Sequence, residues 1–123
     1  MHPTNLSVIA AWSLLLLGVA HLLFALAKFR EPLLAALRAG FVGQFAKPEN
    51  RRTAFWFAIF GVPLTAAGHS AVHAVAVGDL ALLRIIGYYI FVASCIGFAA
   101  FPKSPFPASL AVAAMLLAAG YGW

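Results

Sequence analysis

Two histidines in the second half of the chain have a spacing that suits chemistry. His69 and His73 lie four residues apart in an apolar run, so in a helix both imidazoles project from one face. Pairs of metal ligands and proton relays use this spacing, but two ligands do not complete a metal site. No Glu lies between the two, as it would in a metalloprotease motif. The pair is therefore a candidate for proton transfer more than for metal catalysis.

The basic side chain of Arg84 and the phenolic side chain of Tyr88 are predicted to lie at the same end of the membrane spans as His69 and His73. Arg84 and Tyr88 are four residues apart in the next apolar run. An arginine within a membrane is costly unless it reaches the surface or finds a partner such as Asp79. Two interpretations stay open. The group is a hydrogen-bonded network that fixes helix packing, or it is a polar pocket in which neutral histidines move a proton.

A second group of candidates lies near the opposite end of the spans. His21 is within the first apolar run, and Glu31 and Trp56 fall at or just beyond the boundaries of the runs. A histidine beside an interfacial carboxylate can act as general acid and base on an apolar substrate. Glu31 and Trp56 would serve equally well as headgroup contacts, whereas a histidine inside a span requires a partner. The candidate catalytic residues are thus His21, His69 and His73, and the candidate ligand-binding residues are Trp56, Arg84, Tyr88 and Glu31.

The heights of the histidines argue against a haem. His21 lies 7 residues from Lys28 at the inner end of the first run, and His69 lies 15 residues from Ala54 at the inner end of the second. The difference corresponds to about 12 Å at a rise of about 1.5 Å per residue. A haem held between the two needs both imidazoles at one height. We therefore expect no cofactor, and a haem or a metal held by the histidines is the disfavoured alternative.

The composition indicates which solvent surrounds these residues. Hydrophobic residues make up 64% of the 123 residues and charged residues 9%, against roughly 45–50% and about 25% in soluble domains. A soluble domain of this size has too little interior to bury so much apolar surface. The composition therefore excludes a disordered chain, a nucleic-acid-binding domain and a soluble enzyme. The single cysteine, Cys95, can form no intrachain disulfide. The lipid bilayer is the expected surroundings.

Four apolar runs are long enough to cross a bilayer core of about 30 Å as helices. They cover about residues 6–28, 54–77, 80–101 and 107–123 of a single domain, and Thr53 is the expected N-cap of the second. The first run is longer than the roughly 7–15 residues of a signal peptide and lacks a preceding Lys or Arg, so we expect it to be retained. Between the first two runs, apolar residues at helical spacing predict a short amphipathic helix over about 31–41 at the headgroup level. The predicted fold class is all-α, an integral membrane four-helix bundle with this interfacial helix between spans one and two.

The basic residues predict the orientation of the spans. Seven of the eight Lys and Arg lie in the first and third connections, and only Arg84 lies on the opposite side. By the positive-inside rule, the connection over 28–53 is cytoplasmic and both termini lie outside. We therefore expect a multi-pass protein of the inner (plasma) membrane.

Small residues at every fourth position predict how the helices pack. Such stripes occur in the second, third and fourth spans, and they serve either packing within the bundle or contacts between subunits. Pro63 is expected to kink the second span and to leave the carbonyl of Ile59 without its helical partner. The stripes are Ala66, Ser70, Ala74 and Gly78; Ala93 and Gly97; and Ala114, Ala118 and Gly122.

Several short motifs resemble those of one family. They are Gly18-Val19-Ala20-His21-Leu22-Leu23, Arg52-Thr53-Ala54-Phe55-Trp56-Phe57, Gly61 with Gly68, and Phe101-Pro102-Lys103-Ser104-Pro105-Phe106. In these motifs the chain resembles, over nearly its whole length, the small bacterial membrane proteins grouped as domain of unknown function 6463. The resemblance implies a four-span bundle and no particular activity. His21 and Trp56 match the pattern of that family, whereas His69 and His73 are not part of it.

Three functions are compatible with these observations. We expect binding of a lipophilic small molecule inside the helix bundle, extended to acid/base conversion if the histidines act on it, because polar groups converge beside a kinked helix. The first alternative is a structural or accessory subunit of a membrane complex, or a homo-oligomer. The second is a small transporter, although Glu31, Glu49 and Asp79 all lie outside the spans and leave proton-coupled export without an embedded acid.

Overall fold

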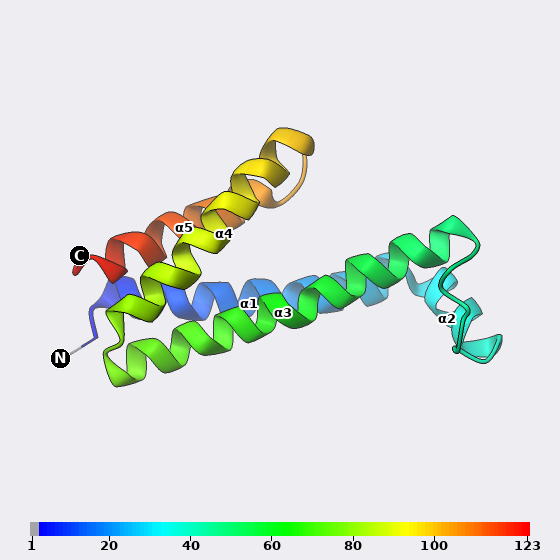
Figure 1. Ribbon diagram of the computed structural model, residues 1–123, viewed down its shortest axis with the longest axis horizontal. Coiled ribbons are helices and arrows are strands. Elements are labelled where there is room, and N and C mark those ends of the chain that lie inside the picture. Colours follow the sequence, from blue (N-terminus) through cyan, green and yellow to red (C-terminus); the bar gives the residue numbers. More distant parts are fainter. Residues whose placement is uncertain (1–2) are drawn as a thin grey trace.

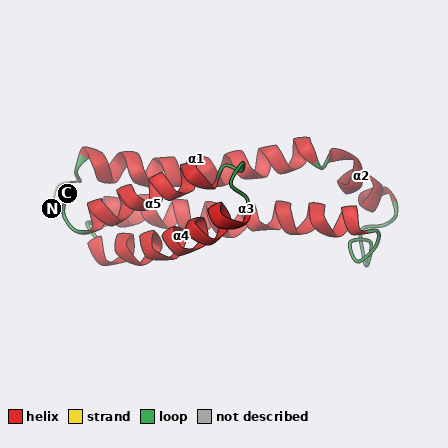
Figure 2. Cartoon of the chain, turned by 90° about the horizontal axis from the view of Figure 1, so that it is seen from above, coloured by secondary structure: helices red, strands yellow, loops and turns green. Residues whose placement is uncertain are grey.

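Helices make up nearly the whole of the computed structural model, which describes residues 3–123. They are α1 (Asn5–Lys28), α2 (Arg30–Arg38), α3 (Glu49–Val77), α4 (Leu80–Ala100) and α5 (Phe106–Gly120). α1 and α3 run side by side along the long axis, and α4 and α5 form a hairpin that leans away from them (Figure 1). Seen from above, this hairpin overlies the half of the α1–α3 pair that is nearer the chain termini (Figure 2). The prediction of an all-α helical bundle is confirmed.

Three of the helices are long and apolar enough to cross a membrane. α1 has 24 residues, α3 has 29 and α4 has 21, and about 20 are needed. α5 has 15 residues, which gives a length of about 22 Å at about 1.5 Å per residue. The fourth predicted span, over 107–123, thus folds as a shorter apolar helix.

The start of α3 differs from the sequence-based prediction. The helix begins at Glu49 after Pro48, so Thr53 lies inside the helix and does not cap it. The hydropathy pattern does not include the first turn because its residues are charged or polar, although Glu and Arg favour a helix about as much as Leu does. α3 then continues through Pro63, and the hydroxyl of Thr65 donates to the carbonyl of Gly61 at 2.7 Å.

α1 and α3 contact each other through small residues at every seventh position. The residues at these positions are buried. A Cβ added to Gly18 would lie only 2.6 Å from the Cα of Thr65. A Cβ on Gly68 would meet the backbone of Leu15 in the same way. The two helix backbones are therefore in close contact, which only small residues allow. The residues of this seam are Ala11, Gly18 and Ala25 of α1, and Ala54, Gly61 and Gly68 of α3.

The small-residue stripes predicted from the sequence pack within the bundle only in part, and contacts between subunits stay open for the exposed members. Ala66 and Ser70 of α3 are exposed, as are Ala93 of α4 and Ala114 of α5. Ala74 and Gly97 are buried as expected. A helix that is apolar on all sides carries small residues on more than one face, so the spacing alone does not show which face turns inward.

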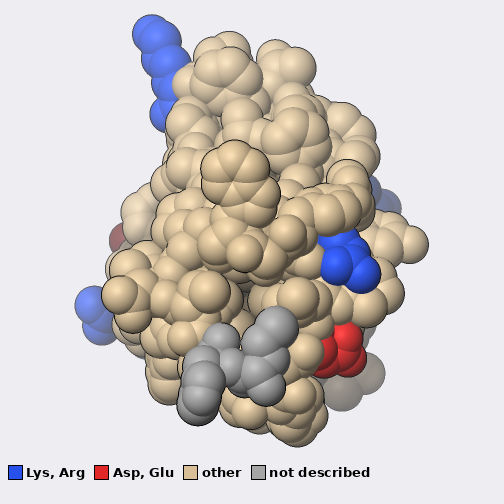
Figure 3. Space-filling model, turned by 90° about the vertical axis from the view of Figure 1, so that its left-hand side faces the viewer, with Lys and Arg blue, Asp and Glu red and all other residues tan. Residues whose placement is uncertain are grey.

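α1, α3, α4 and α5 share one core near the chain termini. The hydroxyl of Thr4 donates to the carbonyl of Trp123 at 3.2 Å, so both ends of the described chain meet there. We call this part, with the α3–α4 turn at Gly78, the terminal end, and the opposite part, with Lys28 and α2, the loop end. Uncharged side chains make up most of the terminal end (Figure 3). The core residues are Ala10, Ala11, Leu14, Ala71, Ala74, Leu83, Ile86, Val112, Leu116 and Ala119.

Candidate functional site

His69 and His73 lie together on the outward surface of α3. With Ser70 they line one open hollow of about 290 Å³, and all three residues are exposed. The buried face of α3 contains Gly61, Gly68 and other small residues, and a helical turn of about 3.6 residues places the histidines on the opposite side. The pair therefore faces away from the bundle interior, and no hydrogen bond joins it to another residue of the described chain.

Arg84 and Tyr88 tie α4 to the end of α5. Arg84 Nη1 donates to the carbonyl of Gly120 at 2.6 Å, and the guanidinium lies 5.2 Å from the ring centroid of Tyr121. The hydroxyls of Tyr88 and Tyr121 are 2.6 Å apart. The carbonyls at a helix C-terminus carry partial negative charge, so this end of α5 attracts a cation.

Of the two alternatives for Arg84, the ion pair with Asp79 does not form in the described chain. The Asp79 carboxylate instead accepts a hydrogen bond from the Leu82 backbone N–H at 2.9 Å and caps the start of α4. A carboxylate at a helix N-terminus is stabilised there both by free N–H groups and by the helix dipole. Arg84, one turn further along, lies instead within reach of α5.

His21 has found its hydrogen-bond partner within the neighbouring helix. Its Nε2 lies 2.7 Å from the carbonyl oxygen of Phe57. Because a carbonyl oxygen only accepts, Nε2 must carry the hydrogen, and Nδ1 then holds the lone pair. The imidazole stacks on the Phe57 ring at 4.4 Å between centroids and meets the edge of Phe60 at 5.6 Å. The half-buried side chain is thus fixed by both polar and aromatic contacts with α3.

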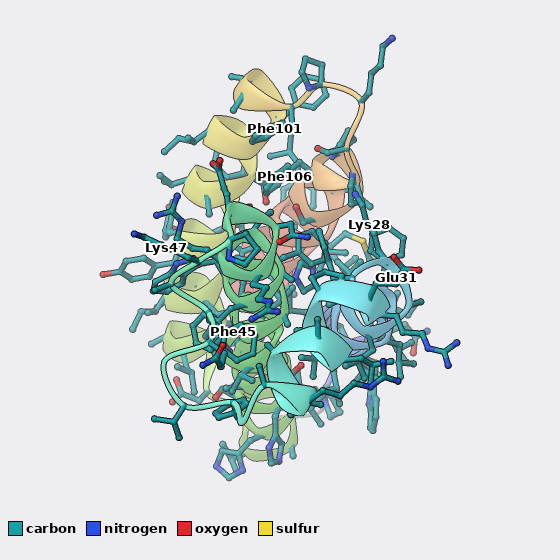
Figure 4. The ribbon with its side chains drawn as sticks, turned by 90° about the vertical axis from the view of Figure 1, so that its right-hand side faces the viewer. Lys28, Glu31, Phe45, Lys47, Phe101 and Phe106 are labelled. Atoms are coloured by element: carbon teal, nitrogen blue, oxygen red, sulfur yellow. The ribbon has the colours of Figure 1, made fainter. Side chains whose placement is uncertain are left out.

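Glu31 and Trp56 lie at the loop end and do not reach His21. Glu31 is exposed in the first turn of α2, and Trp56 is 65% exposed beside Phe55. Figure 4 shows Lys28 and Glu31 on one side of this end, with the loop that contains Lys47 on the other. No hydrogen bond or ion pair within residues 3–123 joins Glu31 to His21. The expected pairing of histidine and carboxylate is therefore absent from the described chain.

The candidate residues consequently form separate groups and not one pocket. A more enclosed hollow of about 90 Å³ lies at the terminal end, where Thr4, Gly78 and Gly122 contribute to its lining. None of the seven candidate residues lines it. Ligand pockets for small molecules usually measure roughly 300–1,000 Å³, so this hollow suits ordered water better than a lipophilic molecule.

The described residues of one chain do not complete a metal site. Within residues 3–123, no three His, Cys, Asp or Glu side chains are placed to hold one metal ion. His21 turns toward Phe57, whereas His69 turns outward. The two therefore face different surroundings, in addition to lying at different heights.

The sequence matches one family model over residues 5–123, that of the family of unknown function DUF6463. The chain belongs to DUF6463. A search of curated proteins and a search of solved structures found no match. All five helices of this DUF6463 chain lie within the matched range.

Several contacts of the DUF6463 chain escaped sequence reasoning. The carbonyls of Phe57 and Gly120 accept hydrogen bonds from candidate side chains, and backbone acceptors have no sequence signal. Ser94 and Ser109 form a hydrogen bond of 2.7 Å between α4 and α5. This pair had a usable signal, because two serines in neighbouring apolar runs need partners when lipid surrounds them.

Proposed function

We propose that this DUF6463 protein is a four-span integral membrane protein that works as a structural or accessory subunit, through helix–helix contacts within the membrane. The observation that carries the proposal is the outward position of His69, Ser70 and His73 on α3. Polar side chains that face lipid are costly, and a partner helix that covers them removes much of this cost.

The distribution of charge supports the orientation. Six of the eight Lys and Arg lie between Lys28 and Arg52 at the loop end, and Lys103 lies in the α4–α5 connection. Thr4 and Trp123 meet at the terminal end, and an even number of spans requires both of these ends of the chain to lie on one side of the membrane. The positive-inside rule then places the connection over 28–53 in the cytoplasm and both termini outside the inner (plasma) membrane.

The short α5 is compatible with a fourth span. Its 15 residues are about 8 Å too short for a bilayer core of about 30 Å, at about 1.5 Å per residue. The connection that precedes it is apolar at Phe101, Pro102 and Pro105, so it can lie within the lipid boundary. Local thinning of the bilayer accommodates the remaining mismatch at modest cost.

The mass of the purified protein in mild detergent tests the proposal. We expect an assembly heavier than the single chain of 13.0 kDa. Ala66→Phe or Ser70→Phe places a ring on the outward face of α3 and should reduce the assembly to single chains. Ala93→Phe, at an exposed position of α4, is the matched control and should leave the mass unchanged. A wild-type protein that is a single chain in every mild detergent contradicts the proposal.

Binding of a lipophilic small molecule is the second candidate function, and the surroundings of His21 favour it. The imidazole lies among the rings of Phe57 and Phe60, with Nδ1 left to take up a proton. Alanine variants of His21, His69 and His73, screened against lipophilic ligands, test this candidate. Unchanged ligand binding in all three variants removes it. A small transporter is the weaker proposal, because Glu31 and Asp79 lie at the ends of helices and Glu49 pairs with Arg52 at 3.8 Å.

A further inference from the structure

The outward face of α3 combines two features that have no partner within the described chain. His69 and His73 line a common hollow on it, and Ala66 and Ser70, four residues apart, are exposed beside them. Small residues at this spacing allow another helix to approach closely. The apolar stretch of α3 from Thr53 to Val77 contains no charged residue. When His69 and His73 are neutral, this face therefore offers hydrogen-bonding groups and has no net charge.

A second copy of the chain fits this face better than a different protein. A neutral imidazole and a serine hydroxyl each contain one donor and at least one acceptor, so the face can hydrogen-bond to itself. Two copies inserted in the same orientation are related by a two-fold axis along the membrane normal, and such a contact brings the same patch of both copies together. Each histidine pair then meets its counterpart at one depth.

The histidine pairs of two copies together supply the four ligands for a metal ion that the described part of one chain lacks. Imidazole nitrogens bind Zn²⁺, Cu²⁺ and Ni²⁺ well, and structural zinc sites are almost always tetrahedral with four ligands. Histidines four residues apart on a helix can share one metal ion. His73 is four residues, or about 6 Å, from the end of α3 at Val77, so an ion can enter from the terminal end.

We propose that a second copy of this chain packs on the outward face of α3, and that His69 and His73 of both copies bind one divalent transition-metal ion. This proposal rests on the proposed subunit function. The partner is a second copy of the chain, and the metal ion bridges the two copies at the outward face of α3. The ion cross-links two α3 helices and fixes their relative height. It has no part in a reaction.

Titration of the purified protein with Zn²⁺ tests the inference. The protein is prepared in mild detergent without a polyhistidine tag, and both the bound metal and the mass of the complex are measured. We expect one Zn²⁺ per two chains, a dimer fraction that rises with Zn²⁺ and falls on chelation, and a Co²⁺ spectrum of tetrahedral type. His69→Gln and His73→Gln should each weaken binding at least about tenfold, since loss of groups that merely support a ligand already costs 10–100-fold.

Two controls separate this site from other binding. His2→Gln removes a histidine outside α3 and should leave Zn²⁺ affinity and stoichiometry unchanged. Gln at positions 69 and 73 replaces exposed side chains, and thermal unfolding without metal checks that both variants are folded.

Three results would overturn the inference. They are no Zn²⁺ binding, binding that survives the double variant His69→Gln with His73→Gln, and one Zn²⁺ per chain without a change in mass. The last is surface chelation by a single helix. A wild type that assembles, is dissociated by Ala66→Phe and binds no Zn²⁺ refutes the metal site but retains the subunit function. Single chains under all conditions refute both.

Discussion

Arg84 shows how this chain accommodates a charge within an apolar helix. Its guanidinium donates to the Gly120 carbonyl at the C-terminus of α5 and lies over the ring of Tyr121. The partial negative charge of the helix end and the face of the ring both favour a cation. Arg84 therefore joins α4 to α5 and needs no carboxylate.

Replacing Arg84 should lower stability more than replacing an exposed arginine. Arg84→Met removes a hydrogen bond to a charged donor, worth about 1.5–3 kcal/mol, and should lower the free energy of unfolding by that order. Arg52→Met is the matched control, because its pair with Glu49 is 3.8 Å long and exposed, and such pairs contribute about 0–1 kcal/mol. Thermal unfolding in detergent measures both, and equal losses would contradict the assigned role of Arg84.

His21 has contacts that explain its presence without catalysis. Its Nε2–H donates to the Phe57 carbonyl, and the ring stacks on Phe57. If α1 spans a membrane as proposed, a polar side chain at this position would otherwise lack a partner. The contacts hold α1 against α3 on the loop-end side of the shared core.

Two substitutions at His21 separate its hydrogen bond from its ring. His21→Phe retains the aromatic contact and should cost about 1 kcal/mol for the lost hydrogen bond. His21→Ala should cost a further 0.5–1.5 kcal/mol or so for the lost ring pair. Chemical or thermal unfolding measures both. If His21→Ala is as stable as the wild type, the structural role is refuted and the candidate ligand site at His21 gains weight.

At the scale of the helices, small residues decide how α1 and α3 fit together. Gly18 and Gly68 lie where a Cβ would meet the partner backbone. Larger residues would therefore separate the two helices along the seam. In the membrane proposed for this chain, lipid offers no hydrophobic drive for association, so this close packing has to hold the pair.

Gly68→Ala should loosen the α1–α3 pair. The new Cβ meets the backbone of Leu15, which cannot rotate away, and overpacking of this kind costs about 1–3 kcal/mol. Ala93→Val adds bulk at an exposed position of α4 and should change the midpoint of thermal unfolding little. If Gly68→Ala lowers the midpoint of thermal unfolding no more than Ala93→Val does, the contact between α1 and α3 adapts to the added methyl group and the assigned role of the seam is contradicted.

The positions of the long helices could be predicted from the sequence, whereas the faces that they bury could not. Long apolar runs led to α1, α3 and α4 because each run has the length that a bilayer requires. In such runs the apolar pattern has no helical period, so nothing distinguished the exposed Ala66 from the buried Ala74. The spacing of His69 and His73 did predict a shared surface, because it depends only on helix geometry.

The partners of the candidate side chains were largely beyond sequence reasoning. The acceptors for His21 and Arg84 are the carbonyls of Phe57 and Gly120. Every residue has such a carbonyl, so its availability depends on how two helices cross. Asp79 was the obvious partner for Arg84 by charge, yet its place before α4 makes it a cap.

At the scale of the whole molecule, the two helix hairpins share a core at the terminal end only. α1 with α3 extends to the loop end, and α4 with α5 leans away from it (Figure 1). Polar side chains on α3 and the basic residues of the loop end both lie outside the shared core. The surfaces of this molecule, more than its interior, therefore contain the groups that can engage a partner.

The proposed four-span topology predicts which ends of the helices are accessible from each side of the membrane. In a Cys95→Ser background, Lys47→Cys and Lys103→Cys should react with a membrane-impermeant maleimide only after permeabilisation, and Trp123→Cys should react in intact cells. The positive-inside rule is the reason, because Lys47 and Lys103 lie in the two basic connections. Reaction of Lys103→Cys in intact cells would mean that α4 and α5 do not form two spans.

Disulfide cross-linking in native membranes tests most directly that the outward face of α3 meets a second copy. Single cysteines at Ser70 and, as a control, at Ala93 are compared in the Cys95→Ser background under mild oxidation. Both positions are exposed within one chain. We expect Ser70→Cys to give a covalent dimer of two chains and Ala93→Cys to remain a single chain. No dimer at Ser70, or equal cross-linking at both positions, would contradict the central claim.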